Sequence, residues 1–180
     1  MNRSAIDSAS RILDEGYSHF LRQTPLWKLP GATFGLRGGE VWLKLEHLQV
    51  AGSFKARGML NRLLSNTIPA SGVIVASGGN AGIATAAAAK ALGVPCEVFV
   101  PTVSSAAKQA RLAELGAKVV VTGAAYSDAL AACLQRQVQT GALLTHAYDQ
   151  PEVVAGAGTL AREIEQQGGL PDSVLVSVGG

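Results

Sequence analysis

Lys55 is the residue of this chain whose surroundings most clearly suggest covalent chemistry. It lies in the segment Gly52-Ser53-Phe54-Lys55-Ala56-Arg57-Gly58, beside a small polar turn and an aromatic residue. A lysine amine in such a place can condense with a carbonyl compound to form a Schiff base. Alternating residues upstream, at 41–46, predict a strand, and apolar residues at helical spacing downstream predict a helix. We therefore expect Lys55 at a strand-loop-helix junction that faces a cleft.

A second candidate site is the segment Ser77-Gly78-Gly79-Asn80-Ala81-Gly82, which follows an apolar strand and opens a helix. Ligands of open α/β sheets bind at such strand ends, because a helix N-terminus offers unpaired N–H groups and partial positive charge to an anion. The glycines allow a ligand to approach the backbone closely, while Ser77 and Asn80 supply side-chain hydrogen bonds. A plain strand-to-helix turn capped by Asn80 is the structural alternative.

A third candidate is the end of the sequence, Ser177-Val178-Gly179-Gly180, where a predicted strand runs into glycines. Such a loop can hold a phosphate with its backbone N–H groups. Two glycines at the end of a sequence are an equally good sign of a cut point, so both interpretations stay open.

The order of strand-like and helix-like segments predicts the fold class. Short β-rich runs alternate with long alanine-rich runs, which is typical of an open, twisted, mainly parallel α/β sheet with helices on both faces. The predicted strands are 72–76, 96–100, 117–121, 142–145 and 174–178. The predicted helices are 81–92, 105–115, 127–140 and 152–167, several of them ended by Gly93, Gly116, Gly141 or Gly168, after a separate N-terminal helix.

Composition and charge argue against several classes of partner. Hydrophobic residues make up 48% of the 180 residues, which is enough for a sizeable core. The formal net charge is +2 and no basic run is interleaved with aromatics, so nothing points to nucleic acid. Residues 1–17 carry charges throughout, and no apolar stretch is long enough to span a bilayer. We expect a cytoplasmic protein.

Other reactive side chains suggest structural roles. The three histidines have no partners at metal-ligand spacing, so no metal site is expected. Cys96 and Cys133 are interpreted as small buried apolar residues rather than as a disulfide or a metal pair. For Lys44 and Arg57, near Lys55, a surface charge is one interpretation, and a role in holding the loop is the alternative for Arg57.

Taken together, these segments resemble the pyridoxal-phosphate enzymes of the β-family (fold type II), and most closely the serine/threonine dehydratases. The resemblance extends over nearly the whole chain. It rests on the order and spacing of Thr24-Pro25-Leu26, Trp42-Leu43-Lys44-Leu45-Glu46, the lysine and asparagine segments, Ala91-Leu92-Gly93-Val94-Pro95, Ala124-Ala125-Tyr126, Asp149-Gln150-Pro151, Gly156-Ala157-Gly158-Thr159 and residues 174–180.

The resemblance implies a role for each motif residue. Lys55 would hold pyridoxal 5'-phosphate as a Schiff base and later act as the catalytic base, with Phe54 beside the cofactor ring. Asn80 would hydrogen-bond the 3-hydroxyl of the cofactor. Gly179 and Gly180 would begin the loop around its phosphate. The substrate carboxylate would be bound by Ser77, Gly78, Gly79, Asn80 and Ala81.

The resemblance also implies a reaction. The protein would eliminate the β-hydroxyl of L-serine or L-threonine, giving a 2-oxo acid and ammonia. Racemases of the family place a second serine after the first in the asparagine segment, whereas this chain has Gly78, which has no proton to give. Many dehydratases carry histidine after the asparagine, whereas this chain has Ala81. Replacement chemistry like that of threonine synthase or cysteine synthase therefore stays open.

Two domains are expected from the resemblance. Residues 68–147 would form a small α/β domain, and residues 1–67 with 148–180 would form part of a large cofactor-binding domain. Family members continue well past the glycine loop, so the C-terminal part of the large domain is expected to be absent here. A chain ending at residue 180 would then expose an apolar sheet edge. A homodimer is the expected assembly.

Two other hypotheses compete with this interpretation. The run Gly156-Ala157-Gly158-Thr159-Leu160-Ala161 fits the G-x-G-x-x-A pattern of dinucleotide-binding units, although Pro151 before it suggests the start of a helix. The second hypothesis is a catalytically incomplete relative of the family, in which Lys55 is a solvated lysine at a helix start.

Overall fold

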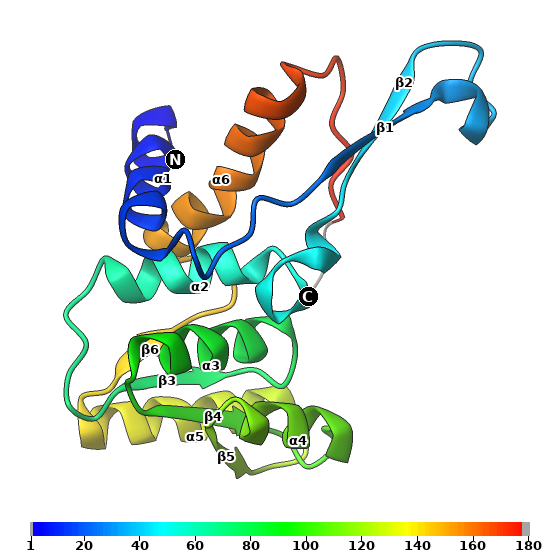
Figure 1. The fold of residues 1–180 in the computed structure, drawn as a ribbon. Helices are drawn as coiled ribbons and strands as arrows, with labels where there is room; N and C mark the ends of the chain where they lie inside the picture. Colours follow the sequence, from blue (N-terminus) through cyan, green and yellow to red (C-terminus); the bar gives the residue numbers. More distant parts are fainter. Residues whose placement is uncertain (1, 178–180) are drawn as a thin grey trace.

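A four-stranded parallel sheet forms one layer of the structure, a computed structural model that describes residues 2–177. Its strands are β3 (Val73–Ala76), β4 (Cys96–Val100), β5 (Lys118–Val121) and β6 (Leu143–Thr145), in the spatial order β5-β4-β3-β6. The strands are rich in valine, leucine and isoleucine, as expected for a parallel sheet that is covered on both faces. The predicted α/β class is confirmed (Figure 1).

Helices cover both faces of this sheet. On one face, side chains of β3 and β4 pack against α3 (Asn80–Leu92) and α4 (Ala106–Glu114). On the other face, Ile74 and Phe99 pack against Ala129 and Cys133 of α5 (Tyr126–Thr140). Successive strand residues therefore point to opposite layers, which is the two-residue period of a β-strand.

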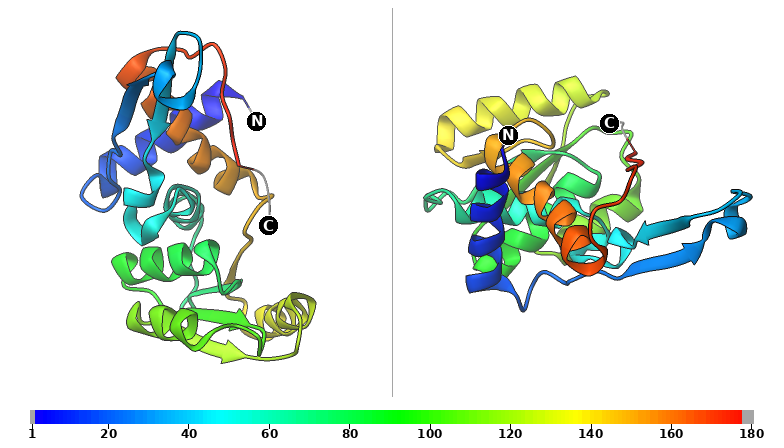
Figure 2. Two further views of the ribbon diagram at one scale, coloured as in Figure 1. Left: turned by 90° about the vertical axis from the view of Figure 1, so that its right-hand side faces the viewer. Right: turned by 90° about the horizontal axis from the view of Figure 1, so that it is seen from above.

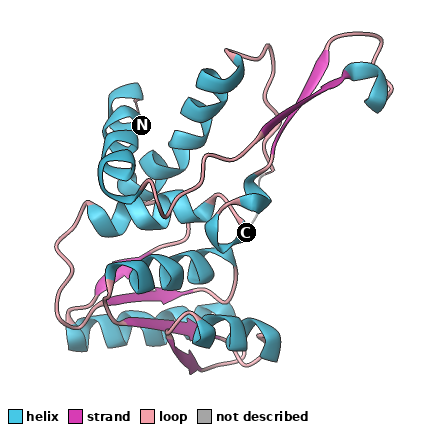
Figure 3. Ribbon diagram, viewed as in Figure 1, coloured by secondary structure: helices cyan, strands magenta, loops and turns pink. Residues whose placement is uncertain are grey.

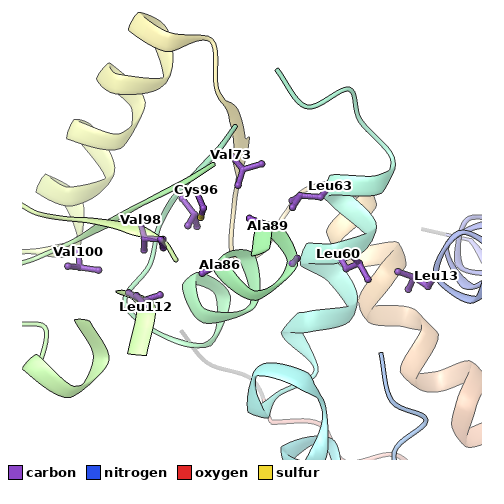
Figure 4. Close-up of a cluster of buried hydrophobic side chains, with 13 residues drawn as sticks. Leu13, Leu60, Leu63, Val73, Ala86, Ala89, Cys96, Val98, Val100 and Leu112 are labelled. Carbon is purple, nitrogen blue, oxygen red and sulfur yellow. The ribbon is translucent and has the colours of Figure 1, made fainter. Parts of the chain in front are cut away.

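Three further helices form a second layer beside α3. They are α1 (Arg3–Tyr17), α2 (Lys55–Leu64) and α6 (Pro151–Gly168). The same apolar cluster continues from the sheet through α3 to Leu60 and Leu63 of α2 and on to Leu13 of α1 (Figure 4). The small sheet and the helices that carry Lys55 therefore share one continuous core.

The crossing of α2 and α6 depends on two glycines. A Cβ atom on Gly58 would lie 2.7 Å from the carbonyl oxygen of Val153, and one on Gly156 would lie 2.5 Å from that of Arg57. Side chains at these positions would push the helices apart. The glycines thus bring the backbone of α6 directly against the turn of α2 that follows Lys55.

An antiparallel hairpin projects from the second layer, as Figures 1 and 2 show. It consists of β1 (Leu26–Pro30) and β2 (Glu40–Lys44), with the short 3-10 helix η1 (Gly31–Phe34) at its tip. Two more 3-10 turns, η2 (Glu46–Leu48) and η3 (Val50–Gly52), lead from β2 to α2. Figure 3 shows that these irregular segments connect the hairpin to the helical layer.

The predicted elements agree with the structure to within two residues, with one exception. Strand β2 ends at Lys44 rather than at residue 46, and α6 includes Gly168, so the residue that ends this helix is Gly169, with φ of 88°. The predicted strand 174–178 is wrong for residues 174–177, which form no strand and are exposed, while Val178 lies outside the described residues. A strand needs a neighbour for its backbone hydrogen bonds, and no segment of residues 2–177 pairs with this one.

Among the described residues, no helix combines the length and apolar character that crossing a bilayer requires.

Candidate functional site

Lys55 is the first residue of α2, at the end of the irregular segment that follows β2. The expected strand-loop-helix junction is therefore confirmed. The turn before it is tight: Ala51 and Gly52 both have positive φ, of 62° and 75°. For Ala51 this left-handed conformation costs about 1 kcal/mol. The strained residue lies in the sharp turn just before the reactive amine, a pattern that is common at functional sites.

The amine of Lys55 is held by a carbonyl and two aromatic rings. Its Nζ donates a 2.6 Å hydrogen bond to the carbonyl oxygen of Ala147. It lies 5.0 Å from the ring centroid of Phe54 and 4.9 Å from that of Tyr148. Burial lowers the pKa of Lys55 because removal of water disfavours the charged form. Within residues 2–177 no carboxylate forms an ion pair with this amine to oppose that effect.

The asparagine segment forms the turn between β3 and α3. The N–H group of Gly79 donates to Oγ of Ser77 at 3.3 Å, and Asn80 is the first helical residue. Gly79 occupies the N-cap position, so the helix start has no side-chain cap. The first-turn N–H groups are thus available to an anion. The structural alternative, in which Asn80 caps the helix, is wrong, since Asn80 is exposed and follows the cap.

The first turns of α2 and α3 meet in one small cluster. Met59, one turn after Lys55, packs with Ala81 at the start of α3 and with Ala147, whose carbonyl accepts the hydrogen bond from Lys55. Segments far apart in the sequence are therefore brought together around the amine. The two glycines proposed for the phosphate loop, Gly179 and Gly180, lie outside the described residues.

The interpretation of Lys44 and Arg57 as surface charges is wrong. The Arg57 side chain is only 2% exposed, and its guanidinium pairs with Glu46 at 2.9 Å and with Glu163 of α6 at 2.6 Å. Nζ of Lys44 lies 2.7 Å from the Glu163 carboxylate. Burial alone would raise the pKa of Glu163, but the hydrogen bonds from Arg57 and Lys44 hold it below its ordinary value. This network ties the start of α2 to α6.

Sequence reasoning missed Glu163 and Tyr148. A signal for Glu163 did exist, since it follows Gly156 and Thr159 at helical spacing and so shares the face of α6 that meets α2. Tyr148 gave no such signal, because it approaches Lys55 from the segment between β6 and α6.

The dinucleotide-binding hypothesis fails on the structure. Residues 156–161 lie in the middle of α6, and the helix begins at Pro151 without a preceding glycine turn. A dinucleotide site needs these glycines between a strand and a helix. Here Gly156 and Gly158 instead allow close packing, against Arg57 of α2 and Ile6 of α1 respectively.

Comparison with known proteins agrees with this arrangement. Residues 17–180 match the family described as pyridoxal-phosphate dependent enzymes. The chain is 40% identical over 147 residues to an L-threonine ammonia-lyase of Thermotoga maritima, covering 79% of this chain and 36% of that protein. It is 36% identical over 163 residues to the catabolic L-threonine dehydratase TdcB of Staphylococcus aureus, covering 89% and 47%.

Solved structures show the same fold. The threonine deaminase of T.th. superimposes with a TM-score of 0.82 at 34% identity, covering 94% of this chain and 52% of that one. Maize serine racemase superimposes with a TM-score of 0.83 at 26% identity, covering 92% and 49%. The chain thus spans less than half the length of these curated relatives, and about half that of the solved structures.

Proposed function

The chain belongs to the family of pyridoxal-phosphate dependent enzymes, and from this we propose that the protein removes the β-hydroxyl of L-threonine or L-serine, releasing ammonia and a 2-oxo acid. One observation carries the proposal. The half-buried amine of Lys55 is bonded to the carbonyl of Ala147 rather than to a carboxylate, and Ala147 packs with Ala81 at the uncapped start of α3.

The residues around Lys55 fit pyridoxal 5'-phosphate. Oγ of Ser53 is buried and has no hydrogen-bond partner among the described residues, so a polar group of a ligand would satisfy it. Phe54 offers an aromatic face, and the exposed side chain of Asn80 is able to bond a ring hydroxyl. Lys55, Phe54 and Asn80 would hold the cofactor, together with Gly179 and Gly180. When bound, the cofactor supplies an electron sink that makes loss of an α-proton feasible.

Lys55 has two tasks in this proposal. Its Nζ holds the cofactor, and when free it accepts the proton from the α-carbon of the substrate. Burial favours the neutral amine, which is the form able to attack a carbonyl carbon or accept a proton. The Ala147 carbonyl and the two aromatic rings keep the long side chain in one direction, so less rotamer entropy is lost when it reacts.

The substrate carboxylate is assigned to the start of α3. Backbone N–H groups from Ser77 to Ala81, including those of Gly78, Gly79 and Asn80, surround a helix N-terminus that no side chain caps. The helix dipole and these donors favour a negative group there. The Cβ of an alanine at Gly82 would lie 1.8 Å from the carbonyl oxygen of Ser77, so glycine is needed for this turn to close.

Elimination is favoured over racemisation because of Gly78. This residue offers no hydroxyl, and a Cβ atom there would lie 2.9 Å from Oγ of Ser104 and 3.3 Å from a methyl carbon of Val100. A second serine at this position, as in a racemase, would require the Ser104 side chain to move. Replacement chemistry like that of threonine synthase or cysteine synthase uses the same amine and carboxylate sites, and it remains the alternative, together with a catalytically incomplete relative.

We further propose the division into domains and the assembly. The parallel sheet and the helices α3 to α5 lie within residues 68–147, which supports a small domain with these bounds. Residues 1–67 and 148–180 are assigned to the larger, cofactor-binding domain. A homodimer in the cytoplasm is the proposed assembly and location.

Product release from the full chain loaded with cofactor tests the proposed reaction. L-threonine or L-serine should give equal amounts of ammonia and 2-oxo acid, and Lys55→Ala should abolish both. Lys90→Ala is the matched control, because Lys90 is exposed at the far end of α3. Equal rates for the chain and its Lys55→Ala variant would contradict the proposal.

A further inference from the structure

The amine of Lys55 lies near two aromatic rings that come from different segments. Phe54 is its neighbour in sequence, whereas Tyr148 belongs to the segment between β6 and α6. Both ring centroids lie about 5 Å from Nζ, within the range of a cation–π contact. Tyr148 is the neighbour of Ala147, whose carbonyl binds the same amine. One short segment thus supplies both a hydrogen-bond acceptor and an aromatic wall.

This segment is held in shape by its own side chains. The N–H group of Tyr148 donates to Nδ1 of His146 at 3.3 Å, and the two rings meet edge to face at 5.7 Å. The N–H group of His146 donates to Oε1 of Gln150 at 2.8 Å, and Nε2 of Gln150 donates to the carbonyl of Leu144 at 3.2 Å. These bonds hold the backbone of the segment, and the contact with the His146 ring orients the ring of Tyr148, which is 49% exposed.

We propose that Tyr148 is a positioning residue which, with Phe54, encloses the Lys55 amine, points it at the Ala147 carbonyl and so sets its reactivity toward an aldehyde. The inference rests on the proposed function of Lys55 as the cofactor-binding residue. Tyr148 affects the reaction only by its influence on Lys55. The aromatic ring of Tyr148 has this influence, so its hydroxyl is not required.

Two opposing effects decide what the ring does to the amine. A cation–π contact at a partly exposed site favours the charged form by about 0.5–1 kcal/mol. Exclusion of water favours the neutral form, and burial lowers the pKa of Lys55 in this direction. Removal of the ring admits water to the amine. The neutral fraction at pH 7 then falls, because each unit of pKa changes it about tenfold.

Burial lowers the pKa of Lys55, and no carboxylate among the described residues forms an ion pair with its amine. His146 accepts a hydrogen bond at Nδ1 from the N–H group of Tyr148. Burial raises the pKa of Tyr126, at the start of α5, and the nearby Tyr148 raises it further, so this phenol stays protonated. The pH profile of Lys55 in the described part of the chain thus reports mainly on its own desolvation.

Reductive methylation with formaldehyde and a borane reductant tests the proposal without cofactor. The rate at Lys55 is followed by peptide mass spectrometry in the full chain between pH 6 and 10, with Lys90 as an internal reference. We expect Tyr148→Ala to slow methylation of Lys55 at pH 7 by about threefold to tenfold and to move the profile to higher pH. Tyr148→Phe should restore the original profile, because the ring is retained.

Two results would overturn the proposal: an unchanged profile in Tyr148→Ala, or a Tyr148→Phe profile like that of the alanine variant. Circular dichroism checks that the variants are folded, and Tyr148→Leu replaces the alanine variant if that one is not. Failure of the proposed function is seen separately. It would appear as a wild-type chain that takes up no pyridoxyl group at Lys55 after incubation with pyridoxal 5'-phosphate and borohydride, whatever the Tyr148 variants do.

Discussion

Nζ of Lys55 and the carbonyl oxygen of Ala147 are joined by a 2.6 Å hydrogen bond between residues 92 positions apart. The bond connects the first turn of α2 with the segment that returns from β6 to α6. Ala147 also packs with Met59 and Ala81, so the same contact region includes the start of α3. The direction of the amine therefore depends on how the parallel sheet and its helices pack against α2.

Replacement of Arg57 should strongly destabilise the fold. Arg57→Met keeps the length of the side chain but leaves Glu46 and Glu163 without their shared partner in a buried place. Breaking a buried pair in this way costs about 3–5 kcal/mol. We expect the lower end of that range, since Lys44 still neutralises Glu163. Urea unfolding of the full chain measures the change.

Arg111→Met is the control for that experiment. Arg111 pairs with Glu114 three residues away on α4, and both side chains are more than half exposed. Such surface pairs contribute about 0.5 kcal/mol or less. A similar loss of stability for both arginine variants would mean that the Arg57 network is no more important than a surface pair.

Gly82→Ala should distort the turn that binds the substrate carboxylate. The new Cβ would lie 1.8 Å from the backbone carbonyl of Ser77, which a side-chain rotation cannot relieve. Overpacking of this kind costs about 1–3 kcal/mol. Gly16→Ala is the matched control in α1, because a Cβ there meets nothing within 4 Å and alanine favours a helix by up to about 1 kcal/mol. Thermal unfolding should move in opposite directions for the two variants.

Acid should remove a contribution of Glu97 to stability. Hydrogen bonds from Arg136, and next from Lys118, lower the pKa of Glu97 from 4.5 to about 2. A depressed pKa in the folded state stabilises the fold above pH 4.5, and this contribution is lost as the pH falls toward 2. Both basic partners are well solvated, so the contribution is about 1 kcal/mol.

Glu97→Gln therefore should lose about 1 kcal/mol at pH 7 and show a flatter stability curve between pH 4.5 and 2. Denaturant unfolding at several pH values gives both quantities. If the variant and the original chain lose stability in parallel across that range, Glu97 does not supply the pH dependence.

The two cysteines should not react with alkylating reagents in the folded chain. Both are free and buried, and burial raises the pKa of Cys96 to about 12 and that of Cys133 to about 11. The thiolate that attacks iodoacetamide is therefore almost absent at pH 8. Mass spectrometry should show no modification without urea and two modifications in urea. Rapid modification of either thiol in the folded chain would disagree with the structure.

Strands β3 to β6 could be predicted from the sequence because their signals are local. Each is a short apolar run next to a helical pattern. A strand that is buried between two helix layers is apolar throughout, so it can be recognised without knowing which strand pairs with it. The strand β1 was missed, since Leu26–Pro30 becomes a strand only through pairing with β2 and ends in a proline. Residues 174–177 have the composition of a strand but no neighbour in the described part of the chain.

The site was predictable to the extent that its residues are neighbours in sequence. Lys55 and the turn from Ser77 to Gly82 stood out as short motifs, and the structure brings their segments together. Arg57 and Tyr148 could not be interpreted in that way. Their partners come from α6 and from the segment before it, so their roles depend on the packing of helices.

Attachment of the cofactor to Lys55 is the claim on which the whole account depends. The full chain is incubated with pyridoxal 5'-phosphate, reduced with borohydride and digested, and its peptides are analysed by mass spectrometry. We predict one pyridoxyl group, on Lys55, and none in the Lys55→Ala variant. A pyridoxyl group on a different lysine, or no pyridoxyl group at all, would contradict the account.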